Sequence, residues 1–128
     1  MTAERFLLLK RAAERRGRRG ELLAMLMLVL KGYRILGRRI RTHAGEIDMV
    51  ARTRGGIVCF VEVKTRNSPR EAQEAVLPRQ AARISRAAEL FMAQRPWLMA
   101  NGVRYDTIVV SARSWPRHLR DAWRPRSR

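Results

Sequence analysis

The chain has 128 residues, a length that favours one domain and leaves little room for a second. Its 28 Lys and Arg residues against 11 Asp and Glu give a formal net charge of +17, while a hydrophobic content of 46% argues against a disordered chain. The only cysteine, Cys59, excludes an internal disulfide and a cysteine-based zinc site.

Two helices are expected before the first strand. Thr2–Arg16 favours a helix, which the glycines at positions 17 and 20 should break. The second helix, Glu21–Lys31, is apolar almost all round and should end at Gly32. Its apolar run, residues 22–30, is about half as long as a bilayer-spanning helix. We therefore expect no membrane span and a cytoplasmic protein.

Three strands, a helix and a fourth strand should follow. Their expected ranges are Tyr33–Thr42, Gly45–Arg52, Ile57–Thr65, Arg79 to about Gln94, and Val103–Ala112. The first three strands can form an antiparallel meander, and the helix can cross over to place the fourth strand parallel to one of them. This order predicts an α/β domain whose mixed sheet has helices on both faces.

The whole chain, residues 1–128, is thus expected to be a single domain. Residues 1–17 would be a helical extension, residues 18–112 the core, and residues 113–128 a basic tail with at most one helical turn.

Acidic and basic side chains end two strands of the expected hairpin. Glu46 and Asp48 are two residues apart and share a strand face, as do Glu62 and Lys64. Carboxylates at the end of an interior strand are costly unless they are paired or bind a metal ion. Because two clustered carboxylates also repel each other, at least one of their pKa values should be raised in the absence of metal.

A divalent cation fits this pattern. Asp48 and Glu62 could hold Mg²⁺ or Mn²⁺, with the backbone carbonyl of Val63 as a third oxygen ligand. Such a cation activates water and neutralises charge on a phosphodiester, and Lys64 beside it could orient the water or stabilise the transition state. The alternative is a cross-strand ion pair of Lys64 with Asp48 or Glu62 that has no chemical role.

These motifs resemble the YraN family of bacterial proteins. The resemblance covers about residues 18–123 and rests mainly on Gly45-Glu46-Ile47-Asp48 followed by Phe60-Val61-Glu62-Val63-Lys64-Thr65-Arg66, with Pro78-Arg79 and Arg104-Tyr105-Asp106 in the same order. That family is similar to restriction-endonuclease-like nucleases of the PD-(D/E)XK superfamily, including archaeal Holliday-junction resolvases. The resemblance implies a restriction-endonuclease-like core.

The resemblance also implies roles for individual residues. Asp48 and Glu62 match the two metal-binding acids, and Lys64 matches the catalytic lysine. Glu21 matches a helix glutamate that is expected to reach the metal, although an acid in the first turn of a helix is also favoured by the helix dipole. Glu46 is a further candidate acid. The chain departs from the family at Gln80-Ala81, where many members have Lys-Gln.

The high positive charge predicts a polyanionic partner, nucleic acid before an anionic membrane, unless an arginine-rich genome explains it. Arg79, Arg83 and Arg86 form one stripe of the expected helix and are the candidate DNA contacts. We therefore expect a metal-dependent endonuclease that acts on DNA. A non-catalytic nucleic-acid-binding protein and a small basic ribosomal or nucleoid protein are the alternatives, and the sequence leaves a homodimer open.

Overall fold

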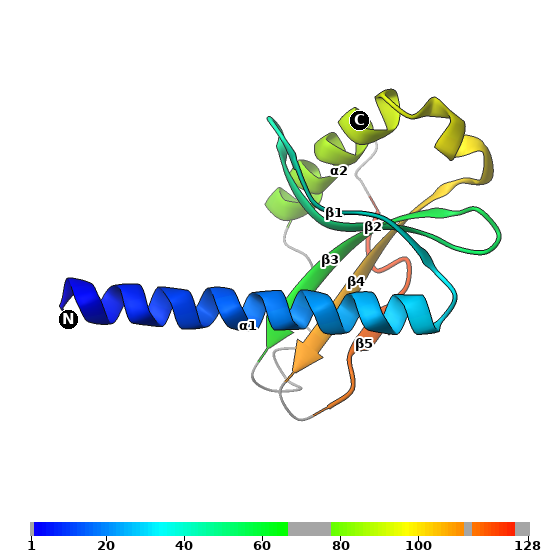
Figure 1. Cartoon of the computed structure of the whole chain (residues 1–128). Helices are drawn as coiled ribbons and strands as arrows, with labels where there is room; N and C mark the ends of the chain where they lie inside the picture. Colours follow the sequence, from blue (N-terminus) through cyan, green and yellow to red (C-terminus); the bar gives the residue numbers. More distant parts are fainter. Residues whose placement is uncertain (1, 67–77, 112–113, 125–128) are drawn as a thin grey trace.

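A computed structural model describes residues 2–66, 78–111 and 114–124. Figure 1 shows a central sheet crossed on one side by the long helix α1 and covered on the other by α2. The elements are α1 Ala3–Leu30, β1 Arg34–Thr42, β2 Gly45–Arg52, β3 Val58–Arg66, α2 Pro78–Ala93, the 3-10 helix η2 Pro96–Asn101, β4 Val103–Ser111 and β5 Arg117–Leu119. The expected α/β class, element order and flanking helices are confirmed, and the arrangement is compatible with a restriction-endonuclease-like fold.

The sheet has the strand order β1-β2-β3-β4-β5. β1, β2 and β3 form the expected antiparallel meander, and β4 lies parallel to β3 after the chain has passed through α2 and η2. A parallel neighbour requires such a crossover, because two parallel strands cannot be joined by a tight turn.

Strand alternation divides the apolar residues between two cores. On β3, Cys59 and Val61 pack with Met27 and Leu28 of α1, and the Cys59 thiol is buried in this cluster. The intervening residue Phe60 faces α2, where a second cluster contains Ile47, Val50, Val58, Phe60, Ala87, Ala88, Phe91 and Met92. β3 is therefore buried on both faces and fixes the positions of both helices.

The expected break at Gly17 and Gly20 is wrong, because α1 is one continuous helix of 28 residues. A Cβ atom at Gly20 would lie 2.7 Å from Thr65 Oγ1, which shows that this glycine lets α1 approach β3 closely. Packing against the sheet outweighs the roughly 1 kcal/mol that a glycine costs inside a helix. Among the described helices, none is long and apolar enough to cross a membrane.

The tail expected after residue 112 contains a strand, where the sequence allows at most one helical turn. Within it, β5 extends the sheet by pairing antiparallel with β4, and the ring of Trp123 packs 4.5 Å from that of Tyr105, centroid to centroid. Residues 112–113 and 125–128 lie outside the described part of the chain. The tail is consequently part of the domain as far as residue 124.

Asp106 on β4 joins the tail to the rest of the fold. Its buried carboxylate accepts two hydrogen bonds of 2.8 Å from Arg104, one of 2.8 Å from His118 Nε2 and one of 3.0 Å from the Asp121 backbone N–H. Arg104 also donates to the Tyr33 hydroxyl just after α1. Although burial opposes it, this set of donors lowers the pKa of Asp106 to about 2.

Replacing Asp106 by Asn should destabilise the fold strongly. The amide keeps the shape of the carboxylate but leaves the Arg104 charge without its partner. The amide NH2 group would also face a group that donates to the carboxylate in the wild type. We expect a loss of about 3 kcal/mol in the free energy of unfolding, measured by urea denaturation. The control is Asp121→Asn, whose exposed side chain forms an ion pair with Arg124 and should cost below about 0.5 kcal/mol. Equal losses in the two variants would contradict this assignment.

Candidate functional site

β2 and β3 separate at the two acids that the sequence singles out. Their pairing runs from Arg52 opposite Val58 to Met49 opposite Val61, and it ends before Asp48 and Glu62 would face each other. The Asp48 carboxylate instead accepts a hydrogen bond of 2.8 Å from the Val63 N–H. β3 continues beyond this point along β4, so the two carboxyl groups lie at a fork in the sheet.

On the other side of Asp48, β1 is irregular at Arg39. This residue lies between Arg38, which faces Met49, and Ile40, and its φ of +48° is uncommon for a residue with a side chain. Arg39 Nε donates to Glu21 Oε2 over 2.9 Å. The arginine thereby ties the glutamate of α1 to the sheet beside the fork.

The pKa values of Asp48 and Glu62 indicate that these two carboxyl groups share one proton. Burial is the largest cause that raises the pKa of Glu62, to about 8, and the charge of Asp48 and a hydrogen bond between the two side chains add to it. Burial also raises the pKa of Asp48, an effect that the Val63 N–H opposes. The expectation of at least one raised pKa is confirmed. Near neutral pH, Glu62 is thus mostly protonated and able to donate to the Asp48 carboxylate.

Lys64 is brought to the same place. Its side chain is on the strand face of Glu62 and is buried, with 6% relative exposure, and its charge lowers the pKa of Glu62. Arg66 acts in the same direction. Two carboxyl groups and an amine therefore meet at the end of the β2–β3 pairing, the juxtaposition that strand periodicity predicts.

Glu21 and Glu46 each lie beside an arginine near the carboxyl pair. Glu21 is close enough for its charge to raise the pKa of Asp48, but its Oε2 is held by Arg39. Glu46 is exposed and lies 3.7 Å from Arg41 Nε. Within residues 2–66, 78–111 and 114–124, no group of three or more His, Cys, Asp or Glu side chains is arranged to hold a metal ion.

The donor set still fits a hard divalent cation. Mg²⁺ is commonly bound in proteins by one or two carboxylates, with water molecules and substrate phosphates completing its coordination. Asp48 and Glu62 provide that number of carboxylates in one place, once the proton that they share has left. A cation here would compete with that proton, so its affinity should increase with pH.

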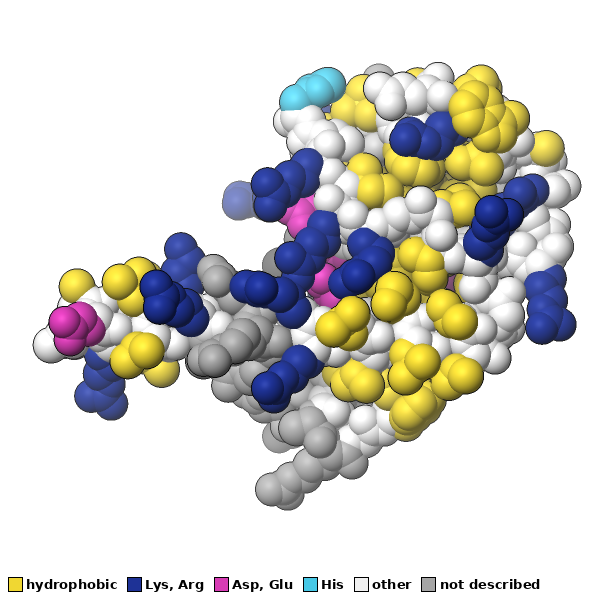
Figure 2. Space-filling view, viewed as in Figure 1, with side chains coloured by type: hydrophobic (Ala, Val, Ile, Leu, Met, Phe, Trp, Pro, Cys, Tyr) yellow, Lys and Arg dark blue, Asp and Glu magenta, His cyan; other side chains and the backbone are white. Residues whose placement is uncertain are grey.

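A cavity of about 210 Å³ opens beside Glu62. Glu46 and Glu62 line it from the sheet, and Gln80, Arg83 and Ile84 line it from α2. Arg79, Arg83 and Arg86 are all exposed on α2, and Arg83 is the member of the stripe that reaches the carboxyl group. Figure 2 shows acidic side chains surrounded by Lys and Arg near the place where α1 leaves the body of the molecule.

The sequence marks Gln80 only as a departure from the family pattern, and it does not mark Arg39 as a site residue. The side-chain oxygen of Gln80 is buried, with no hydrogen-bond partner within the described residues. Its position three residues before Arg83 is a second signal, since residues at that spacing share a helix face. The sequence around Arg39 carries no signal of this kind, because the role of Arg39 depends on a local backbone irregularity in β1.

Comparison with known proteins identifies relatives along most of the chain. Residues 20–110 match the model of the uncharacterised protein family UPF0102, which is the YraN-like family expected from the motifs. A UPF0102 protein of Parvibaculum lavamentivorans is 50% identical over 114 residues, covering 89% of this chain and 85% of the relative. A UPF0102 protein of Maricaulis maris is 51% identical over 116 residues and covers 91% of each chain.

The raised pKa of Glu62 predicts how stability depends on pH in the absence of metal. The folded protein holds a proton on Glu62 that the unfolded chain releases near pH 4.5, so the free energy of unfolding should fall as the pH rises from about 5 to 8. Glu62→Gln should remove most of this dependence and raise the Tm at pH 8 by roughly 5 °C. Thermal unfolding in EDTA measures both effects.

The control for this experiment is Glu46→Gln, which alters an exposed carboxylate on the same hairpin. It should leave the pH dependence as it is in the wild type. If Glu62→Gln and Glu46→Gln gave the same pH profile, the assignment of a protonated Glu62 would be wrong.

Proposed function

The chain belongs to the UPF0102 family, and we propose that it is a divalent-metal-dependent endonuclease that hydrolyses phosphodiester bonds in DNA. The observation that carries this proposal is the pair of carboxyl groups, Asp48 and Glu62, at the fork between β2 and β3 with Lys64 buried beside it. Branched or otherwise structured DNA is the substrate that the family resemblance favours.

In this proposal, Asp48, Glu62 and the Val63 carbonyl would hold Mg²⁺ or Mn²⁺, and Glu21 would act through a water molecule. When bound, the cation would activate water and neutralise charge on the phosphodiester. The Val63 N–H orients the Asp48 carboxylate, and Arg39 keeps Glu21 close to it. Both contacts preorganise acidic groups that would otherwise repel each other.

Lys64 would stabilise the negative charge that develops on the phosphate in the transition state. A lysine amine is a compact donor, and the burial of Lys64 strengthens its interaction with an anion. The adjoining cavity suits the phosphodiester, because the arginine and the amide that line it, Arg83 and Gln80, offer hydrogen-bond donors beside Glu62.

The overall charge of +17 supports DNA as the partner, and the exposed arginines of α2 extend from the carboxyl pair along the surface. Arginine contacts to phosphates fix the position of a nucleic acid without reading its sequence. We accordingly propose binding through the backbone, with the shape of the DNA deciding where cleavage occurs.

A non-catalytic DNA-binding protein is the second candidate. The observation in its favour is that Glu21 is engaged by Arg39, which leaves two clustered carboxyl groups rather than three. A chain of this kind would bind DNA through the same arginines but would not cleave it.

Cleavage assays separate the two candidates. Wild-type protein should cleave at least one of plasmid, single-stranded and four-way-junction DNA when Mg²⁺ or Mn²⁺ is present, and no substrate in EDTA. Asp48→Asn and Glu62→Gln should each reduce the rate by about a hundredfold or more, while Glu89→Gln, at an exposed carboxylate of α2 outside the site, serves as the matched control and should stay within about threefold. DNA binding without any cleavage by the wild type would favour the second candidate.

Salt dependence tests the arginine stripe. Replacing Arg79, Arg83 and Arg86 together by Ala should reduce the slope of log K against log salt by about two to three units, because each phosphate contact releases condensed counterion. The control replaces three exposed arginines at the opposite end of the hairpin and on β5, which are Arg34, Arg54 and Arg117. A larger change in the control than in the stripe variant would place the DNA on another face.

A further inference from the structure

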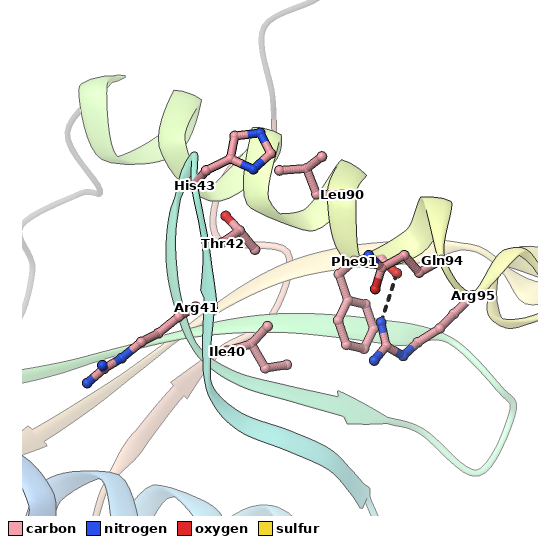
Figure 3. Close-up of a pocket in the computed structure, with 8 residues that line it drawn as sticks. All are labelled: Ile40, Arg41, Thr42, His43, Leu90, Phe91, Gln94 and Arg95. Atoms are coloured by element: carbon pink, nitrogen blue, oxygen red, sulfur yellow. Dashed lines mark hydrogen bonds between the residues drawn. The ribbon is translucent and has the colours of Figure 1, made fainter.

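A second cavity lies where the tip of the β1–β2 hairpin meets the C-terminal part of α2 (Figure 3). Its volume is about 410 Å³, within the range of small-molecule sites. It is lined by Ile40, Arg41, Thr42 and His43 from the hairpin and by Leu90, Phe91, Gln94 and Arg95 from α2 and the residues after it. We refer to these eight residues as the hairpin-tip pocket.

Arg95 is held rigidly at the edge of this pocket. Its guanidinium carbon lies 4.2 Å from the centroid of the Phe91 ring, and its Nη1 donates to the Phe91 carbonyl oxygen over 3.3 Å. One face of the guanidinium is therefore covered by an aromatic ring, and its orientation is fixed before any ligand arrives. A planar cation fixed in this way can stack on a base and donate to an oxygen of the same ligand.

The remaining lining combines apolar and polar groups without an acid. Ile40 and Leu90 supply apolar surface, and His43 and Gln94 supply groups that can donate or accept hydrogen bonds. None of the eight lining residues is Asp or Glu. The Arg41 side chain points away from the pocket in Figure 3, and it lies near Glu46 instead.

Such a lining fits a ligand that is flat, partly apolar and negatively charged. A nucleotide has these three properties, since its base presents an aromatic face with polar edges and its phosphate carries the charge. A base inside a duplex is stacked between its neighbours and cannot enter a pocket, so the ligand must be an unpaired nucleotide.

We propose that the hairpin-tip pocket binds an unpaired nucleotide of the substrate strand, which makes the preferred substrate a DNA with a single-stranded segment next to a duplex. This inference rests on the proposed function for the identity of the partner as nucleic acid. Gln80 and Arg83 at the carboxyl pair lie some ten residues before Leu90 to Arg95, about 15 Å along the helix. That separation corresponds to roughly four nucleotides of a stacked strand.

Binding in EDTA tests the pocket apart from catalysis. The probes are fluorescein-labelled DNAs with equal numbers of phosphates: a blunt duplex of 22 base pairs, and duplexes of 20 base pairs with a four-nucleotide 3′ or 5′ extension. By fluorescence anisotropy, the wild type should bind one of the extended duplexes about 5- to 10-fold more tightly than the blunt duplex.

Two variants should remove this preference. Gln94→Glu introduces a carboxylate at the pocket, and Arg95→Gln removes its fixed positive charge while keeping a polar side chain. The control is Ala100→Glu, which makes the same charge change as Gln94→Glu at an exposed position of η2 outside the pocket. It should weaken binding to all three duplexes equally and preserve the preference.

The outcomes separate this inference from the nuclease proposal. A wild type that cleaves DNA but binds the three duplexes equally would overturn the pocket and leave the nuclease proposal intact. A preference that survives in both Gln94→Glu and Arg95→Gln would also overturn it. A preference lost only in these variants supports the pocket, even if no DNA is cleaved.

Discussion

Two carboxyl groups are half-buried where β2 separates from β3, and their mutual repulsion has to be relieved for the sheet to form. Three effects reduce this repulsion in the absence of metal. The Val63 N–H donates to Asp48, Glu62 keeps a proton, and the positive charge of Lys64 lies nearby. Val63, Glu62 and Lys64 all lie on the part of β3 that continues along β4 after the pairing with β2 has ended. The parallel pairing with β4 therefore keeps Glu62 and Lys64 in an extended strand where β2 has separated.

The rest of the fold serves to hold this fork. Gly20 allows α1 to lie close to Thr65, one residue after Lys64, and this contact places Glu21 near the acids. On the opposite face, α2 packs through Ala87 and Phe91 and carries its arginines past the same point. At the far side of the sheet, the Asp106 network fixes β5 and the end of α1. β3 and β4 therefore carry both the residues that stabilise the fold and those of the candidate site.

The hairpin and the crossover could be predicted because their signals are local. A continuous apolar run marks β3 as an interior strand, and the period of two places Glu62 and Lys64 on one face at the end of that run. The continuity of α1 could not be predicted, since the favourable contact of Gly20 is with a residue 45 positions away. β5 could not be predicted for a similar reason, because His118 is hydrogen-bonded to Asp106 on another strand. Gln80 and Arg39 join the site through tertiary packing and backbone irregularity.

The central claim is that Asp48 and Glu62 exchange their shared proton for a divalent cation. Calorimetric titration of Mn²⁺ at pH 7 in two buffers of different ionisation enthalpy tests it most directly, because the difference between the heats gives the protons released. The wild type should release about one proton per bound Mn²⁺, whereas Glu62→Gln should bind more weakly and release almost none. Equal affinity and equal proton release in the two proteins would contradict the account and leave an ion pair with Lys64 as the role of these acids.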